Sequence, residues 1–473
     1  MKTRTAAALA FLMLFSAACG ARLSERERAL GIGVRGAGGN AGPTAVTPTA
    51  LATATGTGGT GTGNTTGGGG GGVAPGQPGT VACGNPATNP ASDTGVTKNE
   101  IRIATASDIT GVQPGLFKST HQAMSAFAAM VNSQGGICGR GVKVKPIDTK
   151  ADSTANAAAV REACDSQLAL VGSMSAFDNG GASTGEACGI PDLTAVPVNP
   201  SRQLAKNVYG IFPQRPDQLA VGTANFIKSK YPDAIKKAAM LYLNAGVTKA
   251  NAYQRIKAYE SVGFDFGGAG RSRVYEVQVL EANYSPFVQK MKDAGVQYVN
   301  MVANYQSIQK LLQAMEQNEF FPKVRDWDSV AYSPTFVKYN GKTFTAANGS
   351  LVFLTTVISE EASSNPELQL YMSWLSRVAP GAKPDFFGFY AWSAGRLFQK
   401  LATEIGPKLT RRALLAAVKN VHSWNGYGLH VAHDVGNKTI SPCFLYLEIQ
   451  NGTFRRIHPS SGFDCSMGGL VKT

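Results

Sequence analysis

From residue 99 onward, short apolar runs alternate with segments whose apolar residues recur every three or four positions. EIRIATA at 100–106 predicts a strand, and residues 117–131 place Ala123, Phe127 and Met130 on one helical face. Further strands are expected at 141–148, 168–173 and 193–198, with helices at 155–168 and 181–187. This strand–helix alternation predicts a parallel, doubly wound sheet with right-handed crossovers.

The same rhythm begins again near residue 217, which indicates a second α/β unit and hence two lobes. The strands expected there span 238–243, 273–279, 296–303, 328–333 and 349–355, and the helices span 217–231, 249–262, 286–293 and 307–317. Later helices are expected at 367–378, 387–404 and 410–418, before a hairpin that turns at Asn451-Gly452.

The first 18 residues have the pattern of an export signal. Lys2 and Arg4 precede the apolar run Ala6–Phe15, which is too short to span a bilayer, and Ser16-Ala17-Ala18 forms a small-residue cleavage site. We therefore expect an exported chain in which disulfides are permitted.

Residues 19–98 show neither a helical nor a strand period. They are rich in Gly, Thr, Ala and Pro, as in TATGTGGTGTGNTTGGGGGG at 53–72, and offer little apolar surface to bury. This composition predicts a flexible, disordered tether. The chain has 473 residues, of which 43% are hydrophobic, so enough remains beyond the tether for two ordinary domains.

The cysteine count singles out Cys19. The chain has seven cysteines, and an odd number in an exported protein requires an explanation. The segment around Cys19 resembles the lipobox of bacterial lipoproteins, although Ser16 stands where leucine is usual. We expect an acylated Cys19 that holds the protein in the bilayer, at the outer face of the bacterial cytoplasmic membrane. The alternative is a plain signal-peptidase cut that leaves Cys19 free.

Charge and motifs argue against several other classes of function. The formal net charge is +14, but Lys and Arg are spread thinly, which is typical of a solvated surface rather than a nucleic-acid site. The sequence has no Walker loop and no G-x-S-x-G elbow, and His430 and His433 lack the glutamate of a zinc motif. We therefore expect no enzymatic activity, no metal and no cofactor.

The first ordered segment, EIRIATASDITGVQPGLFKSTHQAMSAFAAMVNSQGGICGRGVKVKPID, resembles the opening of type I periplasmic binding proteins. The branch concerned includes the branched-chain amino-acid and amide receptors of ABC importers. The shared frame is a strand, the turn Thr110-Gly111, a helix leading into Asn132–Arg140, and a strand ending at Asp148. ALVGSMS and GFYAWSAG match later blocks of the family.

This resemblance implies an α/β fold of two Rossmann-like lobes with parallel sheets, joined by a multi-crossing hinge, with ligand bound between the lobes. Lobe 1 is expected to comprise 99–213 and 355–425, and lobe 2 to comprise 214–354 and 426–473. The implied function is to capture a small polar molecule, whether an amino acid, an amide or a small organic acid, and to deliver it as a monomer to an ABC permease. The alternative is a membrane-tethered sensor that signals without transport.

Candidate ligand-binding residues follow from the ends of the strands, where open α/β sheets bind ligands. They are Thr110, Gly111, Gln113, Ser173, Met174, Ser175, Asn199, Asn244, Asn304, Tyr305 and Tyr332. The resemblance implies that Ser173 and Ser175 hold a carboxylate and that Tyr305 covers the ligand.

One departure from the family bears on the ligand. Amino-acid receptors of this branch place an acid in lobe 2 to meet the ligand's ammonium group, but the matching loop VAYSPTF at 330–336 has none. A buried ammonium without a counter-charge is costly. The missing acid makes an amino-acid ligand less expected. An uncharged, aromatic, carboxylate or amide ligand agrees equally well with the sequence.

The six remaining cysteines allow 15 pairings. Because the end of a helix and the start of the following strand lie at one edge of such a sheet, we expect Cys138 to pair with Cys164. Cys443 and Cys465 flank the last hairpin and are expected to pair, which leaves Cys83 with Cys188.

Overall fold

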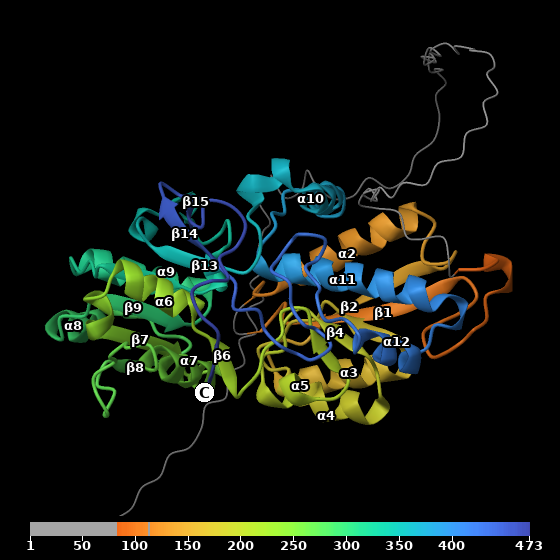
Figure 1. Ribbon diagram of the computed structural model, residues 1–473, viewed down its shortest axis with the longest axis horizontal. Coiled ribbons are helices and arrows are strands. Elements are labelled where there is room, and N and C mark those ends of the chain that lie inside the picture. The colour runs from red at the N-terminus through yellow and green to blue at the C-terminus, as the bar shows by residue number, and fades with distance from the viewer. Residues whose placement is uncertain (1–82, 112–113) are drawn as a thin grey trace, which may run out of the picture. The chain divides into compact units, whose positions relative to one another are not determined.

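The computed structural model describes residues 83–111 and 114–473 (Figure 1). The export signal at 1–18, Cys19, most of the expected tether and Gln113 lie outside the described residues. None of the described helices is long and apolar enough to cross a membrane.

Lobe 1 is built on a five-stranded parallel sheet in the order β2-β1-β3-β4-β5. Its strands are β1 (Glu100–Ser107), β2 (Gly141–Asp148), β3 (Ala169–Val171), β4 (Asp192–Thr194) and β5 (Val208–Gly210). Its helices are α2 (Lys118–Ser133), α3 (Ser153–Ser166), α4 (Asn179–Cys188), α5 (Pro200–Leu204), α10 (Pro366–Val378), α11 (Phe386–Ile405) and α12 (Arg411–Val418). Helices α2 and α11 share a core with one face of the sheet, and α3 covers the other face.

Lobe 2 is built on a seven-stranded sheet in the order β15-β14-β13-β10-β9-β7-β8. The parallel strands are β7 (Ala238–Leu243), β8 (Val274–Val277), β9 (Tyr298–Val302), β10 (Val324–Trp327) and β13 (Leu351–Leu354). The hairpin of β14 (Leu445–Gln450) and β15 (Thr453–His458) adds antiparallel strands. The helices are α6 (Gly222–Lys230), α7 (Thr248–Glu260), α8 (Ser285–Asp293) and α9 (Tyr305–Gln317).

The expected α/β fold with parallel sheets in two lobes is therefore confirmed. The chain passes between the sheets after β5, after β13 and again after α12.

The packing of α11 explains the small residues of GFYAWSAG. This helix begins at the N-cap Asp385, whose carboxylate accepts from the Gly388 N–H, and its side chains are buried along most of its length. A Cβ at Gly395 would lie 2.6 Å from the ring of Phe127 on α2. Only glycine allows this close approach of the two helices.

Two predicted segments form elements of a different type, and helix α5 and strand β5 were not predicted. Residues 217–231, expected as one helix, form the strand β6 (Gln218–Ala220) followed by α6, because β6 pairs antiparallel with β16 (Leu470–Lys472). Residues 328–333, expected as a strand, follow the true strand β10 and include a turn of 3₁₀ helix at Ser329–Ala331.

The folded part begins earlier than residue 99, so the expected end of the tether at 98 is wrong. Val96 is buried in the lobe 1 core, and the Asn89 Nδ2 donates to the Cys138 carbonyl at 2.8 Å. Arg140 Nη2 donates to the Pro90 carbonyl at 2.9 Å. These contacts fix residues 83–98 against the edge of lobe 1.

The disulfides correct two of the expected pairs. Cys83 is bonded to Cys138 and Cys164 to Cys188, so the expected pairs Cys138–Cys164 and Cys83–Cys188 are wrong, whereas Cys443–Cys465 is confirmed. Helices α3 and α4 follow successive parallel strands and therefore run in the same direction. Their C-terminal ends, which carry Cys164 and Cys188, meet at one edge of the sheet.

We predict that the double substitution Cys443→Ser/Cys465→Ser lowers the free energy of unfolding by about 3 kcal/mol, because the bond closes a loop of 22 residues. The Cys164–Cys188 bond closes a loop of 24 residues, so Cys164→Ser/Cys188→Ser is a parallel variant with a similar expected loss. Urea unfolding of the purified variants measures both losses. A loss below about 1 kcal/mol in both variants would contradict the loop-entropy argument.

Candidate functional site

Two adjoining cavities lie between the lobes at the carboxyl ends of the strands. Their volumes are about 260 Å³ and about 190 Å³. Lobe 1 contributes Val198 and Phe387 to both, and lobe 2 contributes Asn251, Val302, Asp328 and Val330 to both. The shared walls make this one candidate binding site with two compartments, in the place where α/β sheets bind ligands.

The walls of the first compartment are mainly aromatic and aliphatic. Its phenylalanines are Phe212, Phe353, Phe386, Phe387 and Phe444. They come from a crossing segment, from β13, from the start of α11 and from the residue before β14, so their convergence is a product of the tertiary fold.

The second compartment is also apolar, with Leu116, Phe117, Phe177, Leu243, Val247 and Val279 in its walls. The rings of Phe117 and Phe387 meet edge to face, with their centroids 4.8 Å apart. Asn304, the N-cap of α9, is among its few polar residues, and its Oδ1 accepts from the Ser307 N–H at 2.9 Å.

An ion pair stands at the junction of the compartments. Arg255 on α7 pairs through Nη1 with Asp328, the first residue after β10, and the same Nη1 donates to Asn300 Oδ1 at 3.1 Å. The side chains are only 15% and 21% exposed. Burial alone would lower the pKa of Arg255, but the Asp328 carboxylate raises it above its ordinary value. The wall therefore contains a permanent cation whose charge is balanced.

Asn300 is held in place by the backbone of Asp326, an acidic residue behind the wall. Its Nδ2 donates to the backbone carbonyl of Asp326 at 2.6 Å. The fully buried Asp326 carboxylate accepts from the hydroxyls of Tyr298 at 2.8 Å and Tyr446 at 3.2 Å. Burial raises the pKa of Asp326 to about 7 despite these hydrogen bonds. Asp326 thus supports Arg255 through Asn300 without facing the ligand space.

Several expected lobe 1 residues are occupied by contacts within the lobe. Ser173 Oγ accepts from the Ala106 N–H at 3.1 Å, and Ser175 Oγ donates to Asp108 at 2.8 Å. The Thr110 hydroxyl donates to Asp148, and Gly111 lies against the Lys150 carbonyl. None of these four residues lines either compartment, as far as the structure describes the walls.

The other expected residues are divided among several places. Met174 lines the first compartment and Asn304 the second. Tyr305 and Tyr332 border a separate recess of about 20 Å³, where the Tyr332 hydroxyl donates to Glu360 at 2.8 Å. The remaining asparagines lie outside the two compartments as described: Asn199 donates to Asp178 at 2.7 Å and Asn244 is exposed.

Sequence reasoning missed the acid of lobe 2 because it treated Asp328 as the start of a strand. Asp328 lies just before the loop 330–336, and the structure places it in both compartments. The sequence did contain a pattern that could have pointed to Arg255. Asn251, Arg255 and Tyr259 recur every four residues on α7, and all three line the first compartment.

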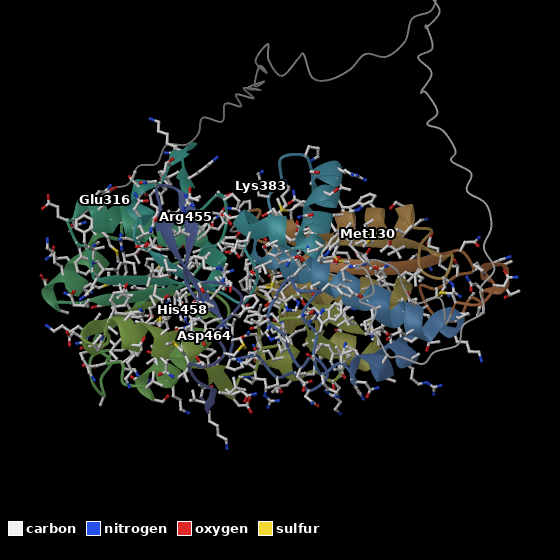
Figure 2. All side chains as sticks on the ribbon, turned by 45° about the horizontal axis from the view of Figure 1, so that its top comes forward. Met130, Glu316, Lys383, Arg455, His458 and Asp464 are labelled. Atoms are coloured by element: carbon white, nitrogen blue, oxygen red, sulfur yellow. A yellow bond between two sulfur atoms is a disulfide. The ribbon has the colours of Figure 1, made fainter. Side chains whose placement is uncertain are left out.

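A segment near the end of the chain, residues 459–473, supports the wall of the first compartment; we call it the strap. Strand β16 pairs with β6, whose Leu219 and Ala220 line the compartment. The disulfide to Cys465 holds the wall residue Cys443. Within the strap, Asp464 Oδ2 lies 2.6 Å from Nε2 of His458 on β15 (Figure 2).

The crossing segments meet at buried histidines beside the first compartment. His433 Nδ1 accepts from the Ser441 N–H at 3.1 Å, and its Nε2 lies 3.2 Å from the Tyr390 hydroxyl. Tyr390 in turn contacts the wall residue Thr355 at 2.8 Å. Burial lowers the pKa of His433 and lowers that of His430 to about 4, so both rings are neutral at pH 7.

The raised pKa of Asp326 predicts a pH-dependent contribution to stability. Because the folded-state pKa of about 7 exceeds the unfolded value near 3.8, the contribution is full below pH 3.8 and is lost as pH rises through 7. The stability of the wild type relative to Asp326→Asn should therefore fall between pH 4 and pH 7. Urea unfolding of both proteins at each pH measures this, and a constant difference would contradict it.

The comparisons with known proteins agree with this architecture. Residues 100–453 match the family model described as periplasmic binding protein. A search of curated protein sequences gives no match. Similar solved structures include a fatty acid ABC transporter substrate-binding protein from Thermomonospora curvata, with a TM-score of 0.64, 17% identity, and coverage of 77% of this chain and 93% of that one.

Two further structures show the same fold. A branched-chain amino acid transporter substrate-binding protein from Streptococcus pneumoniae, in complex with isoleucine, has a TM-score of 0.62, 13% identity, and coverage of 79% and 100%. A solute-binding protein from R. palustris, in complex with 4-hydroxybenzoate, has a TM-score of 0.60, 17% identity, and coverage of 76% and 96%. The family match shows that the chain belongs to the periplasmic binding proteins, and the similar structures show that it has the type I fold.

Proposed function

We propose that the protein is an exported, lipid-anchored solute-binding protein that captures a small, largely apolar molecule between its lobes and delivers it to an ABC importer. The observation that carries this proposal is the two-compartment cavity, whose walls are mostly phenylalanine and aliphatic side chains. Apolar surface removed from water contributes about 25 cal/mol per Å², so an apolar ligand that buries about 200 Å² here gains about 5 kcal/mol.

The ion pair argues against a free amino acid as the ligand. An α-ammonium group removed from water needs a counter-charge. The acid that the first compartment offers, Asp328, is already paired with Arg255. Ser173 and Ser175, the lobe 1 serines expected to hold an α-carboxylate, are buried against their own lobe and line neither compartment. Both ends of an amino acid thus lack the partners that the resemblance implied.

The related structures support a broad range of ligands for this fold. Their descriptions name a fatty acid transporter, isoleucine and 4-hydroxybenzoate. An organic acid with a large apolar part therefore fits the compartments better than an amino acid or a small polar amide.

We predict that apolar acids such as octanoate stabilise the protein without its tether, whereas free amino acids do not. A ligand at 100 times its Kd should raise the free energy of unfolding by about 2.7 kcal/mol. Thermal unfolding with a panel of apolar acids, aromatic acids, amides and amino acids measures the shift. Strong shifts with amino acids alone would contradict the proposed ligand class.

The substitution Val330→Trp tests whether such ligands bind between the lobes, since Val330 lines both compartments. It should abolish the ligand-induced shift because the indole fills the junction. Val378→Trp, at an exposed position on α10, is the matched control and should leave the shift unchanged.

The proposed anchor gives a separate prediction. The substitution Cys19→Ala removes the thiol that would carry the lipid, so the protein should move from the membrane fraction to the medium. Immunoblots of fractionated cells measure this distribution. Retention of the variant in the membrane fraction would contradict lipidation at Cys19.

A further inference from the structure

We infer that the ligand carries a carboxylate and that Arg255 binds it, while Asp328 acts as a positioning residue that keeps the guanidinium in place. This inference rests on the proposed function and deepens it by naming the head group of the ligand.

Arg255 has hydrogen-bond donors that its contacts within the protein do not use. A guanidinium has five N–H donors in a fixed plane. In the structure, the contacts of Arg255 with Asp328 and Asn300 both use Nη1. Within the described residues, no hydrogen bond is made by Nε or Nη2. These two nitrogens form the side of the guanidinium that matches the two oxygens of a carboxylate.

The Nε and Nη2 side of the guanidinium belongs to a residue that lines the first compartment. Arg255 lines the first compartment, and its side chain keeps 15% of its surface exposed. Its guanidinium carbon lies 5.8 Å from the centroid of the Phe353 ring, another wall residue. The unpaired donors thus belong to a group that borders an apolar cavity, where a donor without a partner is costly. A carboxylate bound there would remove that cost.

Hydroxyl-bearing residues line the same compartment as Arg255. Tyr259 lies one helical turn after Arg255, and its hydroxyl is 3.2 Å from that of Thr223; both residues line the first compartment. Burial raises the pKa of Tyr259, so this hydroxyl remains a donor. The nearest fixed negative charge in the wall, Asp328, sits at Nη1 of the same guanidinium, leaving the other side of the cation for the ligand.

Asp328 also gives the site its selectivity. An ammonium group would have to compete with Arg255 for the only acid of the cavity walls as described. A ligand amine must therefore break an existing ion pair, whereas a ligand carboxylate adds to it. The apolar body of the ligand then extends past Val330 and Phe387 toward the second compartment.

The test uses three probes that share one apolar body: 4-phenylbutyrate, 4-phenylbutanamide and 4-phenylbutylamine. Isothermal titration calorimetry of the wild type should show at least tenfold tighter binding of the acid than of the amide, and the weakest binding for the amine. In Arg255→Gln/Asp328→Asn, which keeps the wall neutral, the acid should lose tenfold or more while the amide changes less than threefold.

Arg255→Lys serves as the second variant, because it keeps the charge but lacks the planar fork. It should bind the acid with intermediate affinity. Thermal unfolding of each variant checks that it folds. Equal affinities of the wild type for acid and amide, tighter binding of the amine, or an unchanged acid-to-amide ratio in the double variant would overturn the inference.

The outcomes separate this inference from the proposed function. If the probes bind, and Val330→Trp abolishes their binding, but the acid has no advantage, the head-group assignment fails and the capture of apolar molecules stands. If none of the three binds, and the octanoate and aromatic-acid panel also gives no shift, the proposed ligand class fails and the head-group assignment fails with it.

Discussion

The pairing of Arg255 with Asp328 determines what the space between the lobes can bind. A lone carboxylate at this position would attract a cation, and a lone guanidinium would give the wall a net positive charge. Together they leave a wall with no net charge. Because the rest of the lining is mostly aromatic and aliphatic, the main attraction for a ligand is the burial of apolar surface. The polar groups then select the ligand's orientation and head group rather than supply most of its affinity.

The same compartment is continuous with the segments that join the lobes. Phe212 lies after β5, Thr355 after β13 and Ser441 after α12, and all line the first compartment. Tyr390 on α11 connects two of these segments through Thr355 and His433, and its ring lies 5.2 Å from that of Phe212. A ligand in this compartment therefore contacts the residues about which the lobes would move. Ligand occupancy and the angle between the lobes are physically coupled in such an arrangement.

Most of the fold could be predicted from the sequence because its strands are apolar runs and its helices have one apolar face. Strands β2 and β7 begin and end at the predicted residues. Two of the failures come from partners that lie far away in the chain. Residues 218–220 are a strand because β16, near residue 470, pairs with them. Cys83 meets Cys138 because residues 83–98 pack along lobe 1, which no local pattern indicates.

The site was harder to predict, because residue type does not reveal which polar groups are already satisfied. Ser173 and Ser175 follow a strand, as a ligand-binding serine would, yet both are buried outside the cavity walls, where Ser173 accepts from the Ala106 N–H and Ser175 donates to Asp108. Hydrogen bonds of buried polar groups are nearly always made within the protein, so a strand-end hydroxyl is free for a ligand only where the fold leaves it unpaired. Arg255 is the opposite example, because its sequence position does not suggest a binding residue, yet it lines the cavity. It lies in the middle of a helix, where charged residues usually face solvent, but α7 packs against β7 and β9, and this packing turns Arg255 to the compartment, where it lies over Phe353 of β13. Under the proposed function, the ligand still binds between the lobes, as in the family, but a lobe 2 cation takes the role that lobe 1 hydroxyls were expected to have.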